Sequence, residues 1–390
     1  MVYPVFDRYR GGPIGAQVKL RDFSDTNTLG RSLSTHLDFL RFGAAMVVFV
    51  SHVALPAVSG GLLPLRPLIE LADDAVMAFF VLSGFVIAYT ARTRDRDLTD
   101  YTEARLARLY SVALPALVVT ILADEIGMRL APSVYAGLWH HEWNPLVQIG
   151  AAVTFTNELW YGSIRPFSDG PYWSLGYEFW YYVLFGIGFY LRPGVRWIAA
   201  ALVFALVGPK ILALLPLWLL GVALYRTRGR IPESVGWALF VGSIAAYLVF
   251  RGTDLGHATH WWMDWRVVQL VGEGYSRHLP SKYVTGILFA CHIAGFAAIQ
   301  HRVSLRSVER PIRWLAGMTF SLYLLHYPLL HLATAALPGE ARSWPRAALV
   351  TGLVLLAIAA LASVTERKKR VARRAIDAVG LAFMRRWKPA

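Results

Sequence analysis

The sequence predicts an all-α fold, a polytopic membrane bundle of about ten transmembrane helices. Of its 390 residues, 56% are apolar and only 16% are charged, whereas a soluble domain carries about 25% charged residues. Long apolar segments recur along the chain, and short basic loops separate many of them. No series of alternating ten-residue segments is present, as a membrane β-barrel would require. These observations favour helices that cross a bilayer.

The first third of the chain begins with a polar, Gly-rich segment and continues with three spans. Residues 1–36 lack the apolar core of a signal peptide, so we expect a cytoplasmic N-terminal tail. A Gly/Pro-rich link at 58–73 and a basic stretch at 92–108 separate the apolar segments. The predicted spans are 37–57, 74–91 and 107–123.

The middle of the chain contains two ambiguous segments. Residues 145–159 are apolar but short for a span, which needs roughly 17–25 residues, so a re-entrant or interfacial segment is predicted there. A span follows at 172–191. The apolar stretch 195–225 is too long for one crossing, has basic flanks and contains Gly208-Pro209. We expect two short spans that turn at this Gly-Pro pair.

The last third predicts four more spans and a basic tail. The spans are 234–250, 282–300, 314–335 and 345–365. The tail, 366–390, is rich in Lys and Arg and has apolar residues at helical spacing. It is expected to be cytoplasmic and could form an interfacial helix on the inner membrane surface.

The net charge of +14 has a topological explanation. With ten spans, both tails and the basic loops 92–108, 192–196, 226–232 and 301–313 fall on one side of the membrane. Positive charge collects in cytoplasmic loops, so both termini are predicted to be cytoplasmic. The same distribution argues against nucleic acid as a partner, because the basic residues are dispersed among apolar spans rather than gathered in a groove.

The first span carries two ionisable side chains, Arg41 and His52. Such residues inside a span are functional candidates. They are eleven residues apart, which is close to three helical turns and about 16 Å along a helix, so both face the same direction. Asp38 precedes Arg41 by three residues and could pair with it. A structural alternative is that Arg41 reaches the inner interface and His52 only packs.

Five sequence blocks in order resemble the acyltransferase 3 family of membrane acyltransferases. They are LDFLRFGAAMVVFVSH (37–52), FFVLSGFVI (79–87), RLARLY (105–110), PYWSLGYEFWYY (171–182) and SLYLLHYPLL (321–330). Two departures are Phe39 and Phe42 beside the first Arg, where the family commonly has small residues, and Ser111, where a Pro is common. The resemblance implies that 37–365 form one membrane domain of the surface-polysaccharide O-acetyltransferase type, in a bacterial inner membrane.

Acyl transfer from a thioester to a hydroxyl needs a base, and histidine suits this role at neutral pH. His52 is the candidate, either as general base or as a transient acyl carrier. Glu178 lies in an apolar span and could orient a histidine or hold acceptor hydroxyls; it could also pair with a nearby Tyr or Trp for structure. His326, inside a matching block, is a further catalytic candidate, with core packing as the alternative.

The resemblance implies acyl-CoA, most simply acetyl-CoA, as the donor, and Arg is suited to its phosphates. Arg41, Arg105 and Arg108 are the candidate cofactor-binding residues; Arg105 and Arg108 are three apart in the RLARLY block. The resemblance also implies a carbohydrate or glycolipid as the acceptor, and membrane lipids would surround the protein. No metal site is predicted, because His140 and His141 are adjacent on a loop and lack the spacing of a zinc motif.

Two other functions remain open at this level. A transporter or flippase for a lipid-linked saccharide would also need many spans and buried charges, although no repeated half is visible in the sequence. A polysaccharide polymerase or ligase would use the long segment 124–172 as its outer loop.

Overall fold

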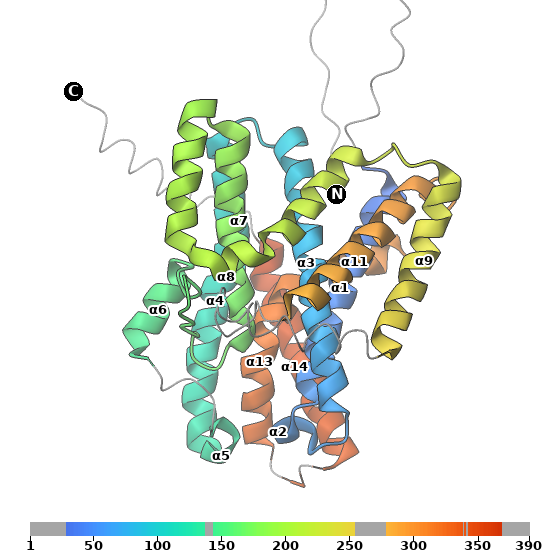
Figure 1. Cartoon of the computed structure of the whole chain (residues 1–390). Helices are drawn as coiled ribbons and strands as arrows, with labels where there is room; N and C mark the ends of the chain where they lie inside the picture. Colours follow the sequence, from blue (N-terminus) through green and yellow to red (C-terminus); the bar gives the residue numbers. More distant parts are fainter. Residues whose placement is uncertain (1–28, 137–142, 254–277, 338, 341, 369–390) are drawn as a thin grey trace, which may run out of the picture.

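The computed structural model describes residues 29–136, 143–253, 278–337, 339–340 and 342–368. In these ranges the chain forms helices and no strand, which confirms the predicted fold class (Figure 1). The long helices are α1 (Arg31–Val53), α3 (Leu65–Thr93), α4 (Leu98–Leu130), α7 (Trp173–Tyr190), α8 (Pro193–Thr227), α9 (Glu233–Gly252), α11 (Leu279–Ile299), α13 (Thr319–Ala336) and α14 (Trp344–Val364). The short ones are α2 (Pro56–Ser59), α5 (Pro132–Tyr135), α6 (Pro145–Val153), η2 (Gly170–Tyr172), α12 (Glu309–Ala316) and η3 (Glu366–Lys368).

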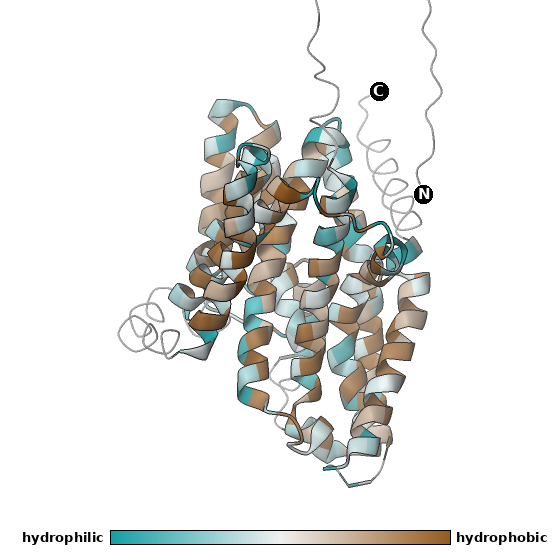
Figure 2. Ribbon diagram, turned by 90° about the vertical axis from the view of Figure 1, so that its right-hand side faces the viewer, coloured by the Kyte–Doolittle hydropathy of each residue, from teal (hydrophilic) through white to brown (hydrophobic). Residues whose placement is uncertain are grey.

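Seven of the described helices are long and apolar enough to cross a membrane: α1, α3, α4, α8, α9, α11 and α14. The 18-residue helices α7 and α13 carry more polar and aromatic side chains. Large apolar side chains remain exposed at helical spacing, for example Val118, Leu122 and Ile126 on α4, and Figure 2 shows apolar residues recurring along the length of the helices. The count of ten spans and the cytoplasmic termini stay predictions.

The predicted break at Gly208-Pro209 is confirmed inside α8. Gly208 has φ 77° and ψ 179°, a conformation essentially restricted to glycine. The carbonyl of Val207 accepts a hydrogen bond from the Trp160 N–H at 2.9 Å. Figure 1 shows the two arms of α8 running in different directions from this point. A Gly-Pro pair therefore turns the chain within the bundle.

Two predicted boundaries are wrong. The span expected at 314–335 is two helices, because α12 ends at Ala316 and α13 begins only at Thr319. Helix α1 begins at Arg31, six residues before the predicted span at 37–57. Leu33 and Thr35 are buried in this added part, so packing extends the helix into what the sequence presents as a polar tail.

Helix α6, Pro145–Val153, has nine residues, a length of about 14 Å. This is too short to cross a hydrocarbon core of about 30 Å. The choice between a re-entrant and an interfacial position stays a prediction. The proposed interfacial helix of the C-terminal tail falls mainly on 369–390, outside the described residues.

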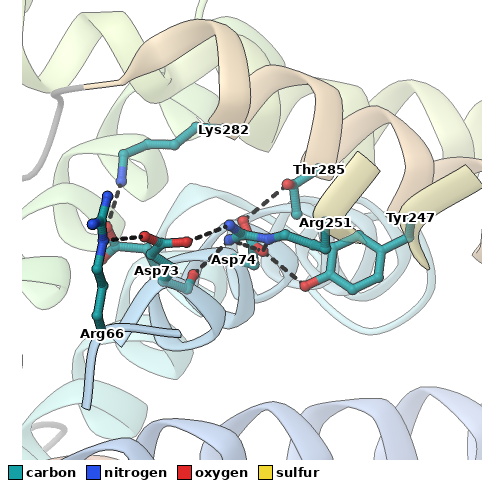
Figure 3. A network of polar contacts seen from close by, with 8 residues as sticks. Arg66, Asp73, Asp74, Tyr247, Arg251, Lys282 and Thr285 are labelled. Carbon is teal, nitrogen blue, oxygen red and sulfur yellow. Dashed lines mark hydrogen bonds and ion pairs between the residues drawn. The ribbon is translucent and has the colours of Figure 1, made fainter. Parts of the chain in front are cut away.

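A network of charged and polar side chains joins α3, α9 and α11 (Figure 3). The Asp74 carboxylate accepts hydrogen bonds from Tyr247 Oη at 2.7 Å, Thr285 Oγ1 at 2.9 Å and Arg251 Nε at 2.6 Å. Lys282 Nζ lies 3.3 Å from Asp73. An acidic group inside a membrane protein needs such partners. The network therefore helps to hold α9 and α11 against α3.

Helix α13 is surrounded by three long helices of the bundle. It packs against α1, α4 and α14, and Figure 1 shows it between α4 and α14. Its N-terminal end faces α1 and η3, the short helix that follows α14. This arrangement brings the first and the last described helices of the chain to one site.

Candidate active site

A cavity of about 620 Å³ lies where α1, α3, α4, α7, α12, α13 and η3 meet. Its walls include the aromatic rings of Phe79, Phe80 and Phe320. The charged residues that line it are Arg41, Arg108, Arg313, Arg367, Asp38, Glu178 and Glu366. Four guanidinium groups thus face three carboxyl groups, and the cavity suits an anionic ligand with an apolar portion.

Arg41 projects into this cavity from α1. Its Nη2 lies 3.2 Å from Asp38 Oδ1, so the predicted pair is confirmed, and the same nitrogen donates to the Ala316 carbonyl at 3.0 Å. Its Nε is buried without a hydrogen-bond partner. A fixed guanidinium with a spare donor is suited to an incoming anion.

Glu178 and Arg108 face each other across the same cavity, with Arg108 Nη2 4.0 Å from Glu178 Oε1. Ser83 Oγ donates to this carboxylate oxygen at 2.8 Å, and Tyr182 Oη also donates to it. Among the described contacts none joins Glu178 to His52 or His326. The structure therefore supports a place for Glu178 in the cavity rather than beside a histidine.

Arg105 lies outside the cavity. Its Nη2 donates to Asp95 Oδ2 at 2.6 Å and to Thr90 Oγ1 at 2.7 Å, and its guanidinium stacks on Tyr101. The residue is 7% exposed. This differs from the expectation that Arg105 and Arg108 act together, because the Asp95 carboxylate holds Arg105 in a separate ion pair.

His52 and His326 form a hydrogen-bonded pair deeper in the bundle. His52 Nδ1 lies 2.8 Å from His326 Nε2, and His326 Nδ1 lies 2.8 Å from the Leu322 carbonyl oxygen. A carbonyl only accepts, so Nδ1 of His326 carries a hydrogen. In a pair of neutral rings, Nε2 of His326 then accepts from Nδ1–H of His52. The lone pair of the outer His52 nitrogen, Nε2, is left for chemistry.

Tyr323 lies between the cavity and the histidine pair. It lines the cavity, its Oη accepts from Ser174 Oγ at 2.9 Å, and its ring centroid is 6.4 Å from that of His326. Arg41 and His52 lie on the faces of α1 that contact α12 and α13, as their spacing predicts. Tyr323 therefore adjoins both the cavity and the histidine pair.

Polar side chains continue beyond the histidine pair. The ring of Tyr327 packs edge-on against the ring of His52, with centroids 4.9 Å apart. The centroids of the Tyr327 and His331 rings are 4.6 Å apart. The loop residue Asp169 is 1% exposed, and neither of its carboxyl oxygens has a hydrogen-bond partner. Burial raises the pKa of this carboxyl well above its usual range. Aromatic, imidazole and carboxyl groups thus gather on this side of the histidine pair.

Sequence reasoning missed Glu366. Its carboxylate accepts hydrogen bonds from the N–H groups of Phe320 and Ser321 at the start of α13, and burial raises its pKa, an effect opposed by the Ser321 N–H and by Arg41. The available signal was an acidic residue directly after the last apolar segment. His140 and His141 lie outside the described residues.

Comparisons with known proteins show the family of this chain. A sequence model of the acyltransferase 3 family, described as an acyltransferase domain, matches residues 35–364. The chain is similar to the acyltransferase MdmB of Streptomyces mycarofaciens, with 26% identity over 358 residues, covering 83% of this chain and 86% of the relative. No solved structure matches the chain significantly. The family match includes both histidines and the cavity-lining residues from Leu37 to Tyr323, and it ends before Glu366 and Arg367. This chain belongs to the acyltransferase 3 family, as an integral-membrane acyltransferase.

Proposed function

We propose that this enzyme transfers an acyl group, most simply acetyl, from acyl-CoA to a hydroxyl of a cell-surface carbohydrate or lipid-linked sugar in a bacterial inner membrane. The observation that carries the proposal is the cationic cavity that adjoins the His52–His326 pair through Tyr323. It provides an anion site and a base about 16 Å apart along α1. A thioester on a long flexible arm fits this separation.

The donor occupies the cavity in this proposal. Arg41 and Arg108 contact its phosphates, because guanidinium forks match phosphate oxygens. The apolar wall contributed by Phe79 and Phe80 lies along its less polar parts. The acceptor approaches His52 from the opposite end, past Tyr327.

His52 acts through Nε2. As a general base it removes the hydroxyl proton while the hydroxyl oxygen attacks the thioester carbon. The C–O bond forms, the C–S bond breaks, and the proton passes from His52 to the departing thiolate, giving free thiol and ester. His326 is a positioning residue in this scheme, because it holds the Nδ1–H of His52 and keeps Nε2 unprotonated.

The acyl-carrier route uses the same nitrogen. Nε2 attacks the thioester carbon, the thiolate leaves, and the acyl-imidazole is then attacked by the acceptor hydroxyl, whose proton completes the thiol. Both routes need the lone pair on Nε2 and differ in whether label becomes bound to the protein.

Labelled acetyl-CoA supplied to membranes containing the full chain tests the function. His52→Ala should lower transfer into saccharide or lipid by about 10²–10⁴-fold, the range for loss of a general base. His301→Ala is the matched control, since His301 is exposed and pairs only with Glu233 among the contacts described. Unchanged transfer by His52→Ala would remove His52 from the mechanism. Label trapped on wild-type protein after acid quenching would favour the acyl-carrier route.

A further inference from the structure

The N-terminus of α13 is capped by a carboxylate from another part of the chain. Glu366 Oε2 accepts from Phe320 N at 3.1 Å, Ser321 N at 3.0 Å and Ser321 Oγ at 3.2 Å. The residue before the helix, Met318, supplies no side-chain cap. The exposed N–H groups of a helix start attract anions. Glu366 is thus an anion already bound within the cavity.

Two polar groups beside Glu366 have no partner. Thr319 is 2% exposed, lines the cavity, and its Oγ1 makes no hydrogen bond. Arg41 Nε, on the facing helix, is also buried without a partner. Buried polar groups normally find partners. One carboxylate leaves both donors unused, whereas the several oxygens of a phosphate could accept from each of them.

We propose that the start of α13 is a phosphate subsite, which Glu366 occupies when no ligand is bound. The subsite consists of the N–H groups of Phe320 and Ser321, the hydroxyls of Thr319 and Ser321, and Arg41. Through the proposed function its phosphate belongs to the acyl-CoA donor; the same chemistry would also fit an anionic lipid headgroup.

Charge and anchoring both allow the exchange. When Glu366 leaves, four guanidinium groups face two carboxylates in the cavity, which favours an anion. The neighbouring residue Arg367 donates to the Trp314 carbonyl at 3.1 Å and stacks on the indole ring. With this anchor in place, rotation of the Glu366 side chain alone can open the subsite.

Binding measurements on the purified full chain in phosphatidylcholine nanodiscs test the subsite. The probes are CoA, inorganic pyrophosphate and pantetheine, which lacks phosphate. Glu366→Gln keeps an oxygen that can cap α13 but removes the competing charge, so CoA and pyrophosphate should bind about tenfold more tightly. Thr319→Val should weaken both about fivefold. Pantetheine binding should change in neither variant.

Glu233→Gln is the matched control, since it makes the same charge change on α9, where Glu233 pairs with Arg302 outside the cavity. The subsite is refuted if Glu366→Gln binds pyrophosphate no better than this control, or if Thr319→Val binds as wild type while melting at the same or a higher temperature. Failure of the proposed function gives a different result, in which pyrophosphate responds to both variants but CoA does not bind. Pyrophosphate binding that is lost when phosphatidylglycerol is added to the discs would assign the subsite to a lipid headgroup, because the lipid would then compete with the probe.

Discussion

The hydrogen bond between His52 and His326 makes the two rings one functional unit. Each histidine is placed by its own helix, but the tautomer of His52 depends on a contact between helices. The Leu322 carbonyl fixes the hydrogen on His326 Nδ1, so His326 Nε2 accepts from His52 Nδ1–H and His52 Nε2 stays unprotonated. A tautomer fixed in this way leaves one lone pair in a defined direction, which general-base chemistry requires. Under the proposed mechanism, we therefore expect His326 to influence the rate without contacting the donor.

Replacing His326 tests this coupling. His326→Phe keeps an aromatic ring but removes the acceptor for His52 Nδ1–H, so kcat should fall about 100-fold, the cost of a misplaced catalytic group. The KM for acyl-CoA should stay unchanged, because His326 does not line the cavity. His326→Gln, whose amide oxygen can accept from His52, should recover part of kcat. A rise in donor KM without loss of kcat would contradict this role.

Arg105 and Glu366 show where residue-level prediction from sequence ends. Spacing correctly paired Asp38 with Arg41, because the two residues share one helix. It could not predict that Asp95 would hold Arg105, or that Glu366 would reach a helix start 45 residues earlier in the chain. Those contacts depend on how separate segments pack, so the sequence could mark Glu366 as a candidate but could not identify the partner of either residue.

At the scale of elements, Gly208 makes the turn in α8 possible. Gly208→Ala should destabilise the protein by about 1–3 kcal/mol, because its backbone conformation is essentially restricted to glycine. The added Cβ would also lie 2.7 Å from Trp160 Cα. Thermal unfolding in detergent should show a lower melting temperature.

Gly188→Ala, in α7, is the control, since a Cβ there meets no atom within 4 Å. It should leave the melting temperature unchanged or raise it, as expected when alanine replaces glycine in a helix. Equal melting temperatures for the two variants would mean that α8 tolerates a side chain at its break. The Gly-Pro break was predictable because both residues act on the local backbone. The separation of α12 from α13 was not, because it leaves the apolar pattern unbroken.

At the scale of the whole molecule, composition and the distribution of charge were sufficient to predict the fold class. They average over many residues and do not depend on any single contact. Whether a given helix crosses the bilayer, in contrast, depends on a few residues in that helix. Helix α13 is the important case, because its two histidines and Pro328 keep it outside the set of strongly apolar helices, although the proposed site needs it to run from the donor cavity toward the acceptor side.

A labelling experiment can decide whether α13 crosses the membrane. In a Cys291→Ala background, which removes the one native cysteine, Ser304→Cys and Glu340→Cys place exposed thiols before α12 and after α13. With cytoplasmic termini and ten spans, a membrane-impermeant maleimide added to intact cells should label position 340. It should label position 304 only after the membrane is permeabilised. Labelling of both from one side would mean that α13 does not span, and it would remove the cross-membrane path from Arg41 to His52 on which the transfer scheme depends.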